Sequence, residues 1–121
     1  KCPYHGRLKV RGRMFTGTVV SRDVHHSATI EMQRRKYVKK FERYEMRRTK
    51  LHVHNPHCLN AAIGEIVQVI ESKPISKTKK FVVIKKIGDD LRYKEKTEAL
   101  QSDLAAQTAL HPKLQSKEER D

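Results

Sequence analysis

Cysteine and long apolar runs are scarce or missing in this sequence, and each of these two absences excludes a class of protein. Tryptophan does not occur, aromatic residues make up 6% of the chain, and there are two cysteines, Cys2 and Cys58. No segment approaches the about 20 apolar residues that a membrane-spanning helix requires. Two cysteines are too few for the disulfide framework of a small secreted domain. We therefore expect a protein of a reducing compartment, the cytosol or the nucleus.

Acidic residues are also scarce relative to basic ones. The chain has 121 residues, with 27 Lys and Arg against 14 Asp and Glu, which gives a formal net charge of +13. This length allows one compact domain with a tail. An excess of one charge repels itself in a compact fold and attracts polyanions. The charge alone leaves RNA, DNA and an anionic membrane surface open as partners.

The positive charge is concentrated in the first part of the chain. Residues 1–88 carry 21 basic and 6 acidic residues, whereas residues 89–121 carry 6 and 8. We therefore expect a polyanion-binding domain over 1–88 and a C-terminal extension over 89–121 that is helical or disordered. Apolar residues in the extension, such as Leu100, Leu104 and Leu110, favour a helix that needs a partner to order it. His111-Pro112 is expected to end that helix.

Short apolar segments separated by turn residues indicate a small all-β domain in the first part. The expected strands are 10–20, 29–33, 50–54, 65–71 and 81–87. Gly12 and Gly17 interrupt the first strand and suit bulges or bends of a barrel. In the third strand we expect Leu51 and Val53 to face inward and His52 and His54 to face outward. Five such strands suggest the Greek-key barrel called the OB-fold, which commonly binds oligonucleotides, although periodicity alone leaves other β-folds open.

Residues 34–50, between the expected second and third strands, form the most informative segment. Nine of its residues are basic and two are acidic, and Tyr37, Phe41 and Tyr44 are interleaved with them. Arginine can contact phosphate with two parallel hydrogen bonds, and aromatic faces can stack on unpaired bases. We interpret the segment as a long basic loop that contacts RNA. The three aromatic residues also fall at helical spacing, so they could instead pack on the barrel.

A second basic cluster, over residues 73–80, joins the expected fourth and fifth strands. Pro74 fixes one backbone angle, and Ser76 and Thr78 place hydroxyl groups beside lysines. This composition suits a preset loop that grips a phosphate backbone, although lysine-rich turns are more often ordinary solvated surface.

The segment that contains this cluster also carries a family resemblance. It reads Gly64-Glu65-Ile66-Val67-Gln68-Val69-Ile70-Glu71-Ser72-Lys73-Pro74-Ile75-Ser76-Lys77-Thr78-Lys79. This resembles the signature of the universal ribosomal small-subunit protein family numbered seventeen in bacteria. Supporting segments are 17–21, 37–48 and 53–56, and the start Cys2-Pro3-Tyr4-His5-Gly6 with Cys58 resembles the archaeal and eukaryotic branch. The resemblance covers residues 1–87. Glu65 and Lys73 depart from the family's usual Asp and Arg.

The resemblance implies an OB-fold barrel that binds small-subunit ribosomal RNA, contacts neighbouring ribosomal proteins and supports subunit assembly and translation. It also implies a cytosolic ribosome, with nuclear or nucleolar passage in a eukaryotic cell, and neither catalysis nor a cofactor. The residues expected to contact RNA are cationic or polar and lie on the strands and basic segments described above. They are Arg11, Arg13, Arg34, Arg35, Lys36, Lys39, Lys40, Arg43, Tyr44, Arg47, Arg48, Lys50, His52, His54, Lys73, Ser76, Lys77, Lys79 and Lys80.

Three other functions are less well supported by the sequence. Zinc binding through His52, His54, His57 and Cys58, with Cys2 as a remote ligand, lacks the usual paired cysteine spacing, so we expect no metal. An enzyme would need a nucleophile placed beside its base or a pair of carboxylates, and no motif positions such groups. A free single-stranded RNA-binding module, such as a translation factor, would usually present aromatic residues on the barrel strands themselves.

Overall fold

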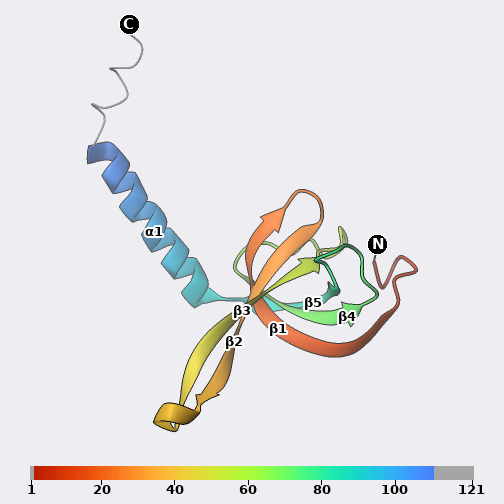
Figure 1. The fold of residues 1–121 in the computed structure, drawn as a ribbon. Coiled ribbons are helices and arrows are strands. Elements are labelled where there is room, and N and C mark those ends of the chain that lie inside the picture. Colours follow the sequence, from red (N-terminus) through yellow and green to blue (C-terminus); the bar gives the residue numbers. More distant parts are fainter. Residues whose placement is uncertain (1, 111–121) are drawn as a thin grey trace, which may run out of the picture. The chain divides into compact units, whose positions relative to one another are not determined.

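Residues 2–110 contain five β-strands and two helices. The computed structural model describes the backbone of residues 2–110 and the side chains of residues 2–106. In chain order the elements are β1 (Val10–Asp23), β2 (Ser27–Val38), the 3-10 helix η1 (Lys39–Phe41), β3 (Arg43–His54), β4 (Glu65–Ser72), β5 (Phe81–Asp89) and α1 (Leu91–Leu110) (Figure 1). They form two compact units, Lys1–Asp90 and Leu91–Asp121.

The five strands close into a barrel in the order β1-β2-β3-β5-β4. Neighbouring strands are antiparallel except for β3 and β5, which are parallel and pair at Val53 with Phe81 and at His54 with Val82. β1 is long enough to pair with both β2 and β4. The five-stranded barrel of the OB type predicted from the sequence is therefore confirmed.

Valine dominates the interior of the barrel. The largest completely buried side chains include Ile30 and the valines at positions 19, 53, 67, 69, 82 and 83. β-Branched residues suit the pleated surface of a strand, and the alternation of buried and less buried positions in β4 matches the two-residue period of a strand. Phe15 and Phe81 pack edge to face against this core with ring centroids 5.8 Å apart. Because the core is small, each of its buried side chains contributes a large share of the stability of the barrel.

Two glycines let β1 curve around the barrel. Gly12 has a φ of +120°, and it lies where the pairing of β1 with β4 shifts register, between Val10 and Met14. At Gly17 a Cβ atom would stand 2.8 Å from the carbonyl oxygen of Glu31 on β2. Both positions therefore need glycine, one for backbone conformation and the other for close strand approach.

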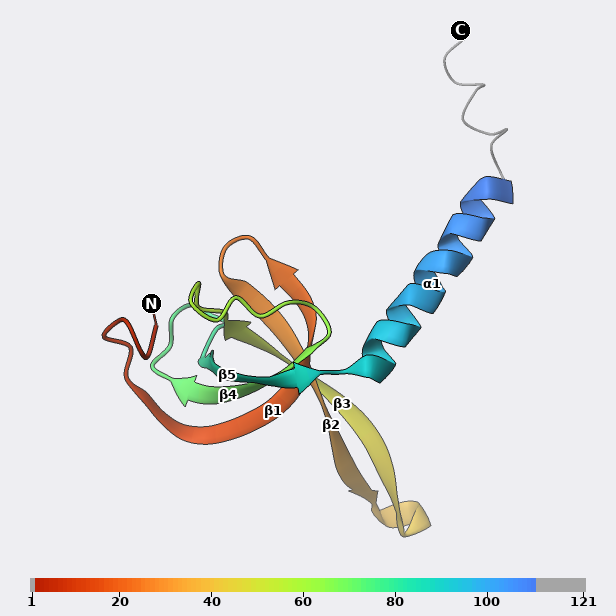
Figure 2. The same ribbon diagram turned by 180° about the vertical axis from the view of Figure 1, so that it is seen from behind.

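The prediction of a long loop over 34–50 is wrong in its secondary structure. β2 runs on to Val38, β3 begins at Arg43, and their pairing continues from Arg34 with Arg47 to Val38 with Arg43. Figure 1 and Figure 2 show this outer part of the hairpin projecting beyond the other strands. We call residues 34–48 the hairpin arm. Cations occur on both of its faces, so the sequence lacks the apolar alternation that marks a half-buried strand.

The C-terminal extension contains the predicted helix. α1 runs from Leu91 to Leu110, and its Leu91, Leu100 and Leu104 side chains are exposed. The helix stop expected at His111-Pro112 lies outside the described residues. Within residues 2–110, no helix combines the length and the apolar character needed to span a membrane.

Replacing Val67 with Asp is expected to unfold the barrel. Val67 is completely buried, and an unpaired carboxylate in so small a core should lower the free energy of unfolding by about 3 kcal/mol or more. Val24→Asp is the matched control, because Val24 is 88% exposed in the turn after β1. Circular dichroism melts should show loss of the folded signal for the first variant only. Equal melting temperatures for the two variants would contradict the assigned core.

Candidate nucleic-acid interface

The hairpin arm carries cations on both of its faces. Residues directly opposite each other in an antiparallel pair share a face. One face therefore carries Arg34 with Arg47 and Lys36 with Glu45, and the other carries Arg35 with Met46 and Tyr37 with Tyr44. The first face continues the inward side of β2, on which Ile30 is buried. Because the arm extends past the barrel, the same side of the strand becomes exposed there.

Most of the cations of segment 34–50 have no anionic partner among the described side chains. Arg47 forms an ion pair with Glu45, and the Nε atom of Arg48 lies 3.5 Å from a carboxylate oxygen of Glu31. The other seven make no ion pair among the side chains that the structure describes, and all are exposed; they are Arg34, Arg35, Lys36, Lys39, Lys40, Arg43 and Lys50. Arg34 and Arg47 stand directly opposite each other, which is unfavourable for like charges. An added polyanion would relieve this repulsion.

The aromatic residues of the arm do not pack on the barrel. Tyr37 and Tyr44 lie opposite each other with ring centroids 5.2 Å apart, and they are 46% and 70% exposed. Phe41 at the tip is 66% exposed, with the Lys40 ammonium 5.5 Å from its ring centroid. Of the two readings left open by the sequence, packing on the core is therefore excluded. Their faces remain available for stacking.

The loop between β4 and β5 is preset by its own hydrogen bonds. The Ser76 hydroxyl accepts a hydrogen bond from the backbone N–H of Lys79 at 3.0 Å, and the Lys79 ammonium donates to the Ser27 hydroxyl at 2.8 Å. Ser76 and Lys79 thus hold the loop in shape and tie it to the start of β2. Lys73, Lys77 and Lys80 are exposed on the same loop.

The remaining expected contact residues divide into exposed and buried groups. Arg11 and Arg13 are exposed near the start of β1, and His52 is exposed with its Nδ1 atom 3.2 Å from the Thr29 hydroxyl. His54, in contrast, is only 7% exposed. By strand alternation His54 points away from the side of β3 on which Val53 is buried, as expected, but it lines a cavity with His26, His57 and Cys58 and is therefore covered rather than exposed.

A separate cluster of cysteine and histidine lies beside the barrel. The Cys2 Sγ atom is 3.3 Å from the Cys58 Sγ atom and 3.7 Å from the His5 Nδ1 atom. Both cysteines are free. A cavity of about 340 Å³ is lined by Cys2, His5, His26, His54, His57 and Cys58. Sequence reasoning considered the two cysteines but missed His5, although the spacing Cys2-Pro3-Tyr4-His5 was a usable signal.

The thiols of this cluster have opposite pKa shifts. Desolvation raises the pKa of the Cys2 thiol, but hydrogen bonds from the backbone at His5 and Tyr4 and from the side chains of Cys58 and His5 outweigh it and lower the pKa to about 6. The hydrogen bond with Cys2, together with desolvation, raises the pKa of the Cys58 thiol. Cys2 is therefore the member of the pair that ionises first.

Comparison with known proteins identifies one family. Residues 17–85 match the family model described as ribosomal protein S17, which spans all five strands in whole or in part and the entire hairpin arm. The chain is 55% identical over 87 residues to the small ribosomal subunit protein uS17 of Methanocaldococcus jannaschii, covering 72% of this chain and 74% of that protein. It is 48% identical over 89 residues to the protein of the same name from Archaeoglobus fulgidus, covering 74% and 79%.

Replacing Asn55 with Ala should destabilise the turn that carries Cys58. The buried Asn55 amide donates to the carbonyl oxygen of Ala61 at 3.0 Å and accepts from the Ala61 N–H at 3.0 Å. Losing both bonds leaves buried backbone groups without partners, so we expect the free energy of unfolding to fall by about 2–3 kcal/mol. Gln33→Ala, at an exposed amide, is the control. A denaturant titration that gives equal midpoints for both variants would show that the Asn55 bonds contribute nothing.

Proposed function

This chain belongs to the ribosomal protein S17 family, and we propose that it works as a structural protein of the small ribosomal subunit by binding small-subunit ribosomal RNA through the hairpin arm. The ribosomal role follows from the family match, which includes most of the barrel and the entire arm. The observation that supports the arm as the main contact is its set of exposed cations without anionic partners.

The chemistry of the arm suits the backbone and unpaired bases of folded RNA. Arg34, Arg35 and Arg43 offer planar groups that can make two parallel hydrogen bonds to a phosphate. Tyr44 and Phe41 offer exposed ring faces on which unpaired bases can stack. Because both faces of the arm are basic, the arm suits insertion between two RNA segments rather than attachment to one flat surface.

The interface extends from the arm over neighbouring parts of the barrel. We assign six exposed cations and the exposed His52 to this extension of the interface. The cations are Arg11, Arg13, Lys50, Lys73, Lys77 and Lys80. In OB-folds the strand 2 and 3 face and the loops that follow strands 1 and 4 are common binding surfaces. We assign Ser76 and Lys79 to shaping the loop and leave the buried His54 out.

We assign RNA binding to residues 1–88 and contact with a neighbouring ribosomal protein to the extension over 89–121. The exposed leucines of α1 support a protein partner for the extension. The cytoplasmic ribosome is the expected location, with nuclear or nucleolar passage during assembly if the source cell is eukaryotic. The family is a structural one, and we infer no catalytic activity.

A free single-stranded RNA-binding module is the less favoured alternative. Such modules stack bases on aromatic residues of the barrel strands. Here the exposed aromatic residues Tyr37, Phe41 and Tyr44 lie on the arm. Sedimentation of the tagged chain in a sucrose gradient separates the two readings, since a subunit component should migrate with small subunits and a free factor should stay near the top.

Replacing Arg43, Arg47 and Arg48 with Glu should weaken RNA binding without unfolding the barrel. All three side chains are exposed on the arm, and the two ion pairs that are lost are exposed enough to contribute little stability. Filter binding to a small-subunit RNA fragment should show a loss of affinity of at least about 100-fold. The melting temperature should stay within a few degrees of the parent.

The matched control replaces Arg92, Lys94 and Lys96 in α1 with Glu. This variant loses the same net charge but leaves the arm intact, so its RNA affinity should fall far less. If the two triple variants bind equally weakly, net charge rather than the arm determines affinity. If the arm variant unfolds, the arm is part of the folding unit and not a projection from it.

The salt dependence of RNA binding should report how many phosphates the arm contacts. Each neutralised phosphate contributes about 0.7–0.9 to the slope of log affinity against log salt concentration. The parent should therefore show a steep slope, and the Arg43, Arg47 and Arg48 variant should show one that is shallower by about 2–3. A parent slope near zero would exclude binding through phosphates.

A further inference from the structure

We infer that Cys2, His5 and Cys58 form a zinc site that fastens the N-terminal segment to the turn after β3. The three side chains each offer one ligand atom, and these atoms all lie within 4.8 Å of one another. Two thiolates and an imidazole are a common ligand set for zinc and a poor one for magnesium or calcium. The site lies apart from the residues assigned to RNA, so it does not rest on the proposed function.

The Cys2–His5 distance fits a tetrahedral zinc site, and the two Sγ atoms lie slightly closer together than such a site requires. Zinc binds sulfur at about 2.3 Å and imidazole nitrogen at about 2.0–2.1 Å, which places tetrahedral ligands about 3.5–3.8 Å apart. The Sγ atoms of Cys2 and Cys58 are 3.3 Å apart, and the Cys2 Sγ atom is 3.7 Å from the His5 Nδ1 atom. Small rotations of the side chains would bring all three ligands to a single ion.

The N-terminal half of the site is built on a tight turn. The Gly6 N–H donates to the Cys2 carbonyl oxygen at 2.9 Å, and a Cβ atom on Gly6 would stand 2.8 Å from that same oxygen. The turn thereby brings His5 beside Cys2. The Tyr4 hydroxyl, between these two ligands in the sequence, donates to the Ile84 carbonyl oxygen of β5 at 3.2 Å. The pair of ligands is thus held against the barrel.

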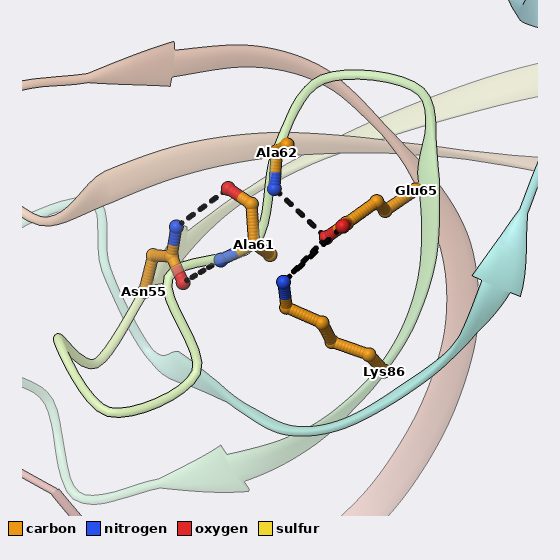
Figure 3. A network of polar contacts seen from close by, with 5 residues as sticks. All are labelled: Asn55, Ala61, Ala62, Glu65 and Lys86. Carbon is orange, nitrogen blue, oxygen red and sulfur yellow. Dashed lines mark hydrogen bonds and ion pairs between the residues drawn. The ribbon is translucent and has the colours of Figure 1, made fainter.

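The other half of the site is a turn fixed by buried polar contacts. Leu59 and Asn60 donate backbone hydrogen bonds to the Pro56 carbonyl oxygen at 3.1 Å and 2.9 Å, so the chain turns at Cys58. Figure 3 shows how the rest of this connection is held, with the Asn55 amide bound to Ala61. The same figure shows the Glu65 carboxylate accepting hydrogen bonds from the Ala62 N–H and the Lys86 ammonium. Cys58 is therefore presented by a rigid segment.

The fourth coordination position faces further imidazoles. His26 and His57 line the same cavity, and their ring centroids are 5.8 Å apart. His57 precedes Cys58 in the chain, so a change of the His57 rotamer would supply a fourth ligand. A water molecule in the cavity is the other candidate for that position. The ligands Cys2 and Cys58 are 56 residues apart, and a metal ion that joins them would restrict a long segment of the unfolded chain. The role we assign to zinc is structural.

The sequence-based expectation of no metal rested on a different set of residues. In that set, the exposed His52 forms a hydrogen bond with the Thr29 hydroxyl. Cys2 and Cys58 lie beside His5, which the expectation did not include. The competing use of the two thiols is a disulfide bond between Cys2 and Cys58. It requires loss of two electrons to an oxidant, whereas a reducing compartment keeps the thiols available to a metal.

The test measures zinc bound to the full chain purified under reducing conditions. After loading with zinc and desalting, elemental analysis should find about one zinc per chain, and Cys2→Ser and Cys58→Ser should each reduce this to near zero. His5→Gln should weaken zinc affinity by more than about tenfold. His25→Gln is the matched control, because His25 is exposed in the turn after β1 and does not line the cavity.

Cobalt gives a second readout of metal binding, the absorption spectrum of the bound ion, which reports directly on the thiolate ligands. Bound Co²⁺ should show a sulfur-to-metal charge-transfer band that falls by about half when one of two thiolates is removed, and circular dichroism should confirm that each variant is folded. The inference is overturned if the parent binds less than about 0.1 zinc per chain. It is also overturned if the cysteine variants retain full binding, or if the reduced chain oxidises to a Cys2–Cys58 disulfide in the presence of excess zinc. RNA affinity, measured in parallel, tests the proposed function separately.

Discussion

The parallel pairing of β3 with β5 is the constraint on which the other features of the barrel unit depend. It fixes Val53 beside Phe81 and His54 beside Val82, at the end of β3. At the opposite end of β3, its pairing with β2 continues beyond the barrel, and this excess length forms the hairpin arm. The pairing of β3 with β5 sets where the chain leaves β3, so the turn with Cys58 emerges beside the N-terminal residues.

Separation of charge from core explains how so basic a chain can fold. The buried core consists of valine, alanine and isoleucine, while the cations of the arm are exposed. Repulsion between neighbours such as Arg34 and Arg47 acts on strands that already project from the barrel, so it strains the core little. The arm is therefore a place where positive charge can accumulate until a polyanion neutralises it. The small core supplies the stability, and the arm is the binding surface that we propose.

The sequence predicts the barrel better than it predicts the site. The apolar segments 65–71 and 81–87 predict the bounds of β4 and β5 to within two residues, because buried strands consist of continuous apolar runs. The arm was expected as a loop because its exposed strands show no alternation. Strand periodicity correctly places His54 on the face opposite to Val53, but it does not reveal that the neighbouring histidines and cysteines cover that face. The approach of Cys2 to Cys58 joins residues far apart in the chain, which no local pattern encodes.

We propose that the hairpin arm is the main contact with RNA and that the barrel strands contribute less. Ultraviolet crosslinking of the chain bound to small-subunit ribosomal RNA, followed by mass spectrometry of the peptides, tests it most directly. Crosslinked nucleotides should concentrate on peptides from residues 34–48, with Tyr37, Phe41 and Tyr44 as the favoured positions. Crosslinks confined to peptides from β1, β4 and β5, with none on the arm, would contradict the account.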